Sequence, residues 1–232
     1  MTPPDGDLVR LSASDLWQRQ KDFYCREGIG AWQGKIPYYA TSNAFIANAY
    51  AQLIFAYLED QRAHGSVTER AVIVELGAGP GLFAYYVVRR LDDLLRTFAQ
   101  PTHEYLYVLT DVAQANIDYW CHHPAWEPYI AEGKVDFGHL DLAENADLTL
   151  EVSGDTLPAQ GSTSRPMIAI ANYVFDSIPV DIFRTYEGDL QQGLVPRSPQ
   201  FESGEATNAA VTLEDIDSPI HYRRGEGRFR SP

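Results

Sequence analysis

The sequence predicts an α/β fold in which helices cover a parallel sheet. Two observations lead to this prediction. Short apolar segments alternate along the chain with segments whose apolar residues recur at helical spacing, which is typical of β-α-β units. In addition, the run VIVELGAGPG at residues 72–81 passes from a buried-strand pattern through three glycines into a helical pattern. Such folds place binding sites at the carboxyl ends of their strands.

The N-terminal part of the chain is predicted to be helical, because two segments there combine a capping residue with an apolar face. These helices run from Ser14 to about Glu27 and from Ser42 or Asn43 to about Arg62, with turn-rich residues 28–40 between them. We expect residues 1–66 to form a helical lid or cap. Aromatic residues of the turn-rich segment, namely Trp32, Tyr38 and Tyr39, could wall a site.

The central part is predicted to contain four strands, three helices and a hairpin. The strands are residues 71–76, 105–110, 134–138 and 167–171, the helices are 81–98, 114–120 and 176–182, and the hairpin joins 183–186 to 191–195 around Glu187-Gly188-Asp189. Because the strands are separated by helices, we expect them to be parallel.

Composition limits the classes of function. A net charge of −14 argues against binding to nucleic-acid backbones, which depends on clustered Lys and Arg. No apolar run approaches the roughly 20 residues that cross a bilayer, and the first residues lack a signal-peptide pattern, so we expect a cytoplasmic protein without membrane contact. Cys25 and Cys121 lie far apart without a CxxC pair, which predicts neither a disulfide nor a metal site.

The glycine turn narrows the choice of ligand. No Lys-Ser or Lys-Thr pair follows Gly81, so a P-loop is disfavoured. The spacing G-x-G-x-G differs from the dinucleotide pattern G-x-G-x-x-G, and a charge on Glu75 would repel a pyrophosphate, which disfavours a nicotinamide oxidoreductase. S-adenosyl-L-methionine fits better, since it has no phosphate and its amino and sulfonium groups are cationic. The alternative is a glycine turn that only closes a tight strand-helix connection.

The segment Glu75-Leu76-Gly77-Ala78-Gly79-Pro80-Gly81 resembles the first motif, acid-x-G-x-G-x-G, of the class I S-adenosylmethionine-dependent methyltransferases. The resemblance implies a Rossmann-like cofactor-binding domain over residues 67–195 and places Glu75, Gly77, Ala78, Gly79 and Gly81 at the cofactor.

Polar residues after the next two predicted strands are further candidates. Asp111 could accept hydrogen bonds from both ribose hydroxyls of the cofactor, and its alternative role is to cap the following helix. The methyltransferase resemblance implies that Asp141 contacts the adenine amino group and that Leu140 or Leu142 packs on the ring. The alternative for Asp141 is a turn residue.

The segment ANYVFDSIPV at residues 171–180 resembles the loop N-E-hydrophobic-hydrophobic-D-A-L-P-V of the MidA-type methyltransferases, which include the mitochondrial complex I assembly factor that methylates a protein arginine. Asn172 and Asp176 match, and the resemblance, which spans roughly residues 36–195, implies that they orient the methyl acceptor and that Asn172 also contacts the cofactor. Tyr173 replaces the glutamate that could hold a guanidinium, so the acceptor can be a protein side chain or a small molecule. The alternative is a capped turn at Asp176.

The C-terminal part is predicted to be a flexible tail or a truncated remainder of the domain, because Pro, Ser, Glu and Asp dominate from residue 196 onward. The methyltransferase resemblance implies seven strands, of which about five are evident. Either the chain is a fragment, or residues 210–213 and 220–222 supply weak replacements. The sequence thus predicts a methyltransferase, and the alternative is a noncatalytic cofactor-binding module for assembly.

Overall fold

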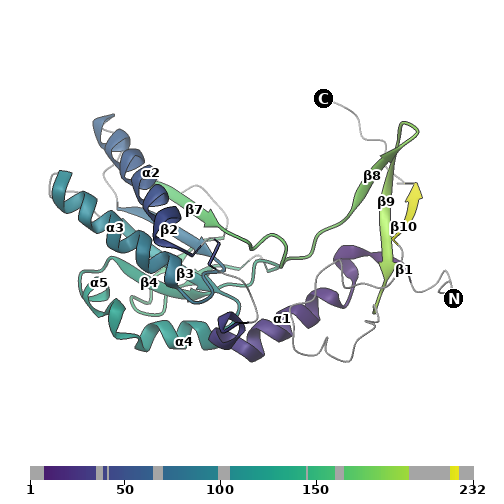
Figure 1. Cartoon of the computed structure of the whole chain (residues 1–232), viewed down its shortest axis with the longest axis horizontal. Coiled ribbons are helices and arrows are strands. Elements are labelled where there is room, and N and C mark those ends of the chain that lie inside the picture. The colour runs from purple at the N-terminus through teal and green to yellow at the C-terminus, as the bar shows by residue number, and fades with distance from the viewer. Residues whose placement is uncertain are drawn as a thin grey trace. The chain divides into compact units, whose positions relative to one another are not determined.

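The computed structural model (Figure 1) describes residues 8–34, 39–40, 42–64, 70–98, 105–144, 146–159, 165–198 and 220–224. The chain divides into two compact units. One is Tyr24–Phe175, and the other combines Met1–Phe23 with Asp176–Pro232. The predicted boundaries at residues 66 and 195 differ from this division. The helix at residues 44–63 packs against the helix at residues 82–98 and so belongs to the larger unit. The strand at residues 189–196 pairs with residues 8–10 and so joins the N-terminal segment to the smaller unit.

The larger unit is built on a parallel four-stranded sheet with the order β4-β3-β2-β7. Its strands are β2 (Ala71–Leu76), β3 (Tyr105–Asp111), β4 (Val135–His139) and β7 (Met167–Ala171), so all four predicted strands are confirmed. The register pairs Leu76 with Ala171 and Asp111 with His139, which brings the carboxyl ends of the four strands to one edge. This is the α/β arrangement that the alternating pattern predicted.

Helices cover one face of this sheet. The helical elements of the unit are η3 (Gly28–Trp32), α2 (Ala44–Ala63), α3 (Leu82–Phe98), α4 (Gln114–His122), η4 (Pro124–Trp126) and α5 (Glu127–Ala131). Helices α2 and α3 lie side by side (Figure 1) and bury residues such as Ile54 and Leu91 with Ile73 of the sheet. Asn43 is the N-cap of α2, since its side chain accepts a 3.0 Å hydrogen bond from the Ile46 N–H.

The other face carries a smaller apolar cluster formed by Val72, Val74 and Val108 with Leu148 and Leu150. A short antiparallel pair supplies part of this cover, formed by β5 (Leu148–Thr149) and β6 (Thr156–Leu157). The central strands β2 and β3 are therefore buried on both faces, which explains their continuous apolar pattern.

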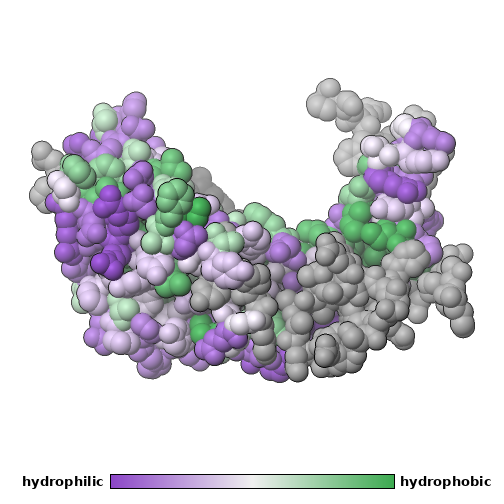
Figure 2. All heavy atoms as spheres, in the orientation of Figure 1, coloured by the Kyte–Doolittle hydropathy of each residue, from purple (hydrophilic) through white to green (hydrophobic). Residues whose placement is uncertain are grey.

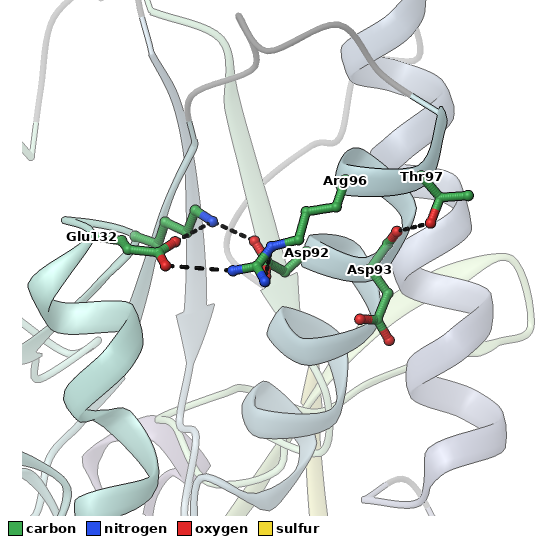
Figure 3. Close-up of polar contacts among 6 residues, drawn as sticks. Asp92, Asp93, Arg96, Thr97 and Glu132 are labelled. Atoms are coloured by element: carbon green, nitrogen blue, oxygen red, sulfur yellow. Dashed lines mark hydrogen bonds and ion pairs between the residues drawn. The ribbon is translucent and has the colours of Figure 1, made fainter.

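A cluster of charged side chains joins α3 to the segment before β4 (Figure 3). Asp92 is buried, forms an ion pair with Arg96 Nε at 2.8 Å and accepts a hydrogen bond from Lys134 Nζ. Glu132 pairs with the same two cations. These contacts compensate the burial of the Asp92 carboxylate and hold the start of β4 against the helix.

The smaller unit is an antiparallel sheet organised around one long strand. Strand β9 (Asp189–Pro196) pairs with β1 (Leu8–Arg10), β8 (Phe183–Tyr186) and β10 (His221–Arg224). Leu11, Leu16, Trp17 and Val195 form its apolar core, together with the first turns of α1 (Leu16–Glu27) and the short helix η2 (Leu11–Ala13). The division between the units passes through α1.

One prediction in the smaller unit needs correction. Residues 176–182 form turns and bends instead of a helix. Asp181 there accepts a 3.0 Å hydrogen bond from the Ser12 N–H of η2, and the Ile182 carbonyl accepts one from the Gly193 N–H of β9, so contacts from distant parts of the chain hold the segment. The predicted hairpin is confirmed, with Glu187 and Gly188 both at positive φ in a two-residue turn.

Residues 221–224 form β10, which pairs with β9 from Gln191 to Leu194, in agreement with the alternative prediction of a weak strand at residues 220–222. Residues 210–213 lie outside the described part of the chain. Figure 2 shows a mixed surface on which polar residues predominate around α2 and α3. Among the described residues, none of the helices combines the length and apolar character needed to cross a bilayer.

Candidate functional site

The candidate site lies at the carboxyl edge of the parallel sheet, where the turn at residues 77–81 connects β2 to α3. Backbone hydrogen bonds join this turn to the neighbouring strand, since the Ala78 N–H donates to the Thr110 carbonyl at 2.8 Å. The Leu140 N–H donates to the Asp111 carbonyl at 2.9 Å. The structure therefore brings the glycine turn and the residues after β3 and β4 to one edge, as the sequence predicted.

All three glycines of the turn adopt positive φ, at 65° for Gly77, 56° for Gly79 and 71° for Gly81. Each also faces a side chain that leaves no room for a Cβ. A Cβ would lie 3.0 Å from Val174 Cγ2 at the first glycine, 2.7 Å from Trp32 Cζ2 at the second and 2.8 Å from Trp120 Nε1 at the third. The glycines are therefore required by backbone conformation and by packing, in addition to any approach of a ligand.

Glu75 lies at the end of β2 and is only 4 % exposed. Its Oε2 accepts a 2.8 Å hydrogen bond from the Tyr107 hydroxyl. Burial raises the pKa of Glu75 to about 8, and the negative charge of Asp111 adds to the increase. The raised pKa favours the neutral form of Glu75 in the free protein, so the charge on which the sequence argument against a pyrophosphate depends is reduced there.

Asp111 ends β3 and is also buried. Its Oδ2 accepts a hydrogen bond from the Gly79 N–H at 3.0 Å, and its Oδ1 accepts one from the Ala113 N–H at 2.9 Å. Burial raises the pKa of this carboxyl, and these backbone bonds oppose the increase. The N-cap of α4 is Ala113 and not Asp111. The side chain of Asp111 instead joins the glycine turn to the end of β3.

Leu140 and Asp141 follow β4. Leu140 is half-buried and packs against the apolar cluster beneath the sheet. Asp141 Oδ1 accepts a 2.9 Å hydrogen bond from the Ala143 N–H, which is the geometry of a turn-forming aspartate. His139 lies beside them, with its Nε2 at 3.0 Å from the Val112 carbonyl oxygen. These contacts show how each residue is held at the edge of the sheet.

Asn172 follows β7 directly. Its Oδ1 accepts a 2.9 Å hydrogen bond from the Tyr50 hydroxyl of α2, whereas its buried Nδ2 has no partner among the described residues. A buried amide without a partner costs free energy, so this nitrogen is a candidate donor to a ligand. Tyr173 is next, exposed and at a φ of 51°, and Val174 then turns inward onto Gly77. A positive φ at a tyrosine is strained, as is common in binding loops.

The last predicted site residue, Asp176, is the first residue of the smaller unit and is exposed there. Of the aromatic residues proposed to wall a site, Trp32 contacts Gly79 as described above, Tyr39 is exposed, and Tyr38 lies outside the described residues. Sequence reasoning missed Tyr50 and Tyr107, because the spacing of both fits ordinary core aromatics and nothing in the sequence pairs them with Asn172 and Glu75.

The arrangement suits a ligand that offers hydroxyl or cationic groups to buried carboxyls and a hydrogen-bond acceptor to Asn172. Within the described ranges, no cluster of three or more His, Cys, Asp or Glu residues could hold a metal ion. The site is therefore built from a glycine turn, two buried acids and one amide.

The sequence model of the family described as "Putative S-adenosyl-L-methionine-dependent methyltransferase" matches residues 53–227, about three quarters of the chain. Among curated proteins, none matches this chain.

Two solved structures, both of proteins from Burkholderia thailandensis, are similar to the chain. One is the native crystal structure of an uncharacterized superfamily protein, with 17% sequence identity and a TM-score of 0.44, and the match covers 82% of this chain and 41% of that one. The other is a "likely methyl transferase" bound to S-adenosyl-homocysteine, with 16% identity and a TM-score of 0.43, and the match covers 87% of this chain and 48% of that one. This chain thus spans less than half the length of either protein.

Proposed function

The chain belongs to the family of S-adenosyl-L-methionine-dependent methyltransferases, and on this premise we propose that it binds S-adenosyl-L-methionine at the carboxyl edge of its parallel sheet and transfers the methyl group to a protein side chain or a small molecule. The observation that carries the proposal is the glycine turn between β2 and α3, whose Gly79 N–H is held by Asp111 at 3.0 Å. A glycine turn held in this way exposes its backbone to a ligand at the carboxyl edge of the sheet.

The cofactor-binding roles fall to residues of this edge. Gly77, Ala78, Gly79 and Gly81 would line the cofactor with backbone, and Asp111 would accept hydrogen bonds from the ribose hydroxyls in addition to those from Gly79 and Ala113. Leu140 and Asp141 would contact the adenine ring. Glu75 lies below the turn, where its carboxyl would respond to the positive charge of the cofactor.

Methyl transfer requires little further chemistry from the protein. When bound, S-adenosyl-L-methionine supplies a methyl group that its sulfonium already activates. The residues of the chain need only position the acceptor, and good positioning can contribute on the order of 7–11 kcal/mol toward lowering the barrier. Asn172 and Asp176 are the residues that we assign to this role, and Tyr50 would keep the Asn172 amide in one orientation.

The polarity of this amide favours one class of acceptor over another. Because Tyr50 donates to one lone pair of Asn172 Oδ1, the group of this amide that has no partner among the described residues is the Nδ2 donor. A guanidinium has only N–H donors, which Nδ2 cannot bind, and Tyr173 supplies no carboxylate, so its acceptors here would be the second lone pair of Oδ1 and Asp176. A hydroxyl, amine or carboxylate offers the lone pairs that Nδ2 requires. The net charge of −14 further disfavours a nucleic-acid acceptor. The cytoplasmic location that we expect from the sequence is a separate prediction.

A second candidate function is a noncatalytic cofactor-binding module that supports assembly of a partner. The observation that favours it is Tyr173, which is exposed at a strained φ of 51° where related enzymes carry a glutamate. Such a module would bind the cofactor and would release no S-adenosyl-homocysteine with any acceptor.

Release of S-adenosyl-homocysteine tests the two candidates. The chain is incubated with S-adenosyl-L-methionine and with peptides or small molecules that carry hydroxyl, amine, carboxylate or guanidinium groups, and the product is measured by mass spectrometry. We expect product with an oxygen or amine acceptor, and its loss in Asn172→Ala with cofactor binding retained. Binding without product for any acceptor would favour the module, and product with guanidinium alone would contradict the assigned acceptor class.

A further inference from the structure

We infer that Trp32 forms one wall of the cofactor site and that its indole contacts bound S-adenosyl-L-methionine. This inference rests on the proposed function, because it presupposes that the chain binds the cofactor. It extends that function by assigning a binding role to a residue outside the glycine turn and outside the strands of the sheet. Trp32 is the last residue of η3 and contacts the turn that carries the cofactor-binding glycines.

The contact between Trp32 and Gly79 is close. A Cβ on Gly79 would lie 2.7 Å from Cζ2, 2.8 Å from Cε2 and 3.1 Å from Nε1 of the indole. The six-membered ring therefore lies against the α-carbon of the middle glycine of the turn, the residue whose N–H is fixed by Asp111. A ligand bound along the backbone of this turn would therefore lie next to the indole.

Several contacts hold η3 in place beneath this ring. Gly28 has a φ of 50° and lies so close to α4 that a Cβ would be 3.1 Å from Ala115 Cβ. Cys25 Sγ lies 3.6 Å from the Val112 carbonyl, directly after Asp111. The Tyr24 ring stacks on Trp32 with centroids 6.1 Å apart and an interplanar angle of 25°. Contacts of residues 24–28, which precede the indole in the chain, thus hold it in position.

The exposure of Trp32 separates it from the other tryptophans of the chain. Trp17, Trp120 and Trp126 are all buried in apolar clusters, whereas Trp32 is half-buried. An indole that is ordered, partly exposed and next to a glycine turn suits an adenosyl sulfonium ligand in two ways. Its face can stack on the adenine, and its π system attracts a cation. Either contact places the ring against the cofactor.

Titration of S-adenosyl-homocysteine followed by tryptophan fluorescence and by calorimetry tests the inference. We expect saturable binding of the ligand to the wild-type chain together with a change in fluorescence. In Trp32→Phe, binding should persist in calorimetry while the fluorescence change disappears. Trp126→Phe is the matched control, because it removes a buried core indole and should keep the change. Trp32→Ala should bind about tenfold more weakly, as expected for the loss of an aromatic stacking contact.

The outcomes separate this inference from the proposed function. If the wild-type chain binds the ligand and the fluorescence change survives in Trp32→Phe, or if Trp32→Ala binds with unchanged affinity, the wall role of Trp32 is wrong and the proposed function stands. If the folded wild-type chain shows no binding in calorimetry, the proposed function itself fails. Circular dichroism of each variant shows whether it is folded, and Trp32→Phe, which keeps an aromatic ring, provides the decisive comparison should the alanine variant unfold.

Discussion

Gly81→Ala should destabilise the larger unit far more than Gly154→Ala, although the two glycines have nearly the same backbone conformation. Gly81 has a φ of 71° and Gly154 a φ of 75°, so an alanine at either position incurs the left-handed penalty of about 1–2 kcal/mol. Only at Gly81 would the new Cβ also overlap a neighbour, because it would lie 2.8 Å from Nε1 and 3.2 Å from Cδ1 of Trp120, a side chain that is 0 % exposed. Nothing lies within 4 Å of the corresponding position at Gly154.

The difference between the two variants therefore measures packing alone. Overfilling a close-packed core typically costs about 1–3 kcal/mol, so Gly81→Ala should lose about 2–5 kcal/mol and Gly154→Ala about 1–2 kcal/mol. Urea unfolding followed by far-ultraviolet circular dichroism gives both values on the same scale. Equal losses in the two variants would refute the claim that the third glycine of the motif is required by Trp120.

Three further predictions concern stability. Burial raises the pKa of Glu75 to about 8, above its value in the unfolded chain, so the native state keeps a proton that the unfolded state has lost between these two pH values. As pH rises through this range, the free energy of unfolding should fall by up to about 1.4 kcal/mol per pH unit. Glu75→Gln should flatten this slope in urea titrations at several pH values. Asp92→Asn, which leaves Lys134 without its buried partner, should cost roughly 1–3 kcal/mol, whereas the exposed Arg96→Ala should cost under about 1 kcal/mol, and similar losses in thermal melts would contradict the burial argument. Glu187→Asn should stabilise the hairpin unit by roughly 0.5 kcal/mol, because asparagine tolerates the φ of 51° better, and an unchanged or lower melting temperature would count against that turn geometry.

The parallel sheet could be predicted from the sequence because its strands are buried on both faces and therefore read as continuous apolar runs. The division into two units could not. It depends on the pairing of β1 with β9, in which Arg10 lies opposite Leu194, and no local pattern reports a contact between residues so far apart in the chain. The predicted helix at 176–182 failed for a related reason, since Asp181 is held by Ser12 from the other end of the sequence.

At the candidate site, the residue types could be predicted and their surroundings could not. The motif located Glu75, but its protonated state follows from burial beside Tyr107 and Asp111, which only the packed structure reveals. Likewise, the glycine spacing suggested room for a ligand, whereas the contact of Trp32 with Gly79 comes from a segment that the sequence describes only as turn-rich. Motifs report which backbone a site uses, and packing decides which side chains complete it.

Calorimetric titration of S-adenosyl-L-methionine and S-adenosyl-homocysteine tests the central claim most directly, with Gly79→Arg and Asp111→Asn as variants of the site. An arginine at Gly79 would meet Trp32 and block the turn, and Asp111→Asn removes the charge while keeping an oxygen for the Gly79 N–H. The account predicts saturable binding of both ligands to the wild-type chain, its loss in Gly79→Arg, and weaker binding in Asp111→Asn. A folded wild-type chain that binds neither ligand would contradict it.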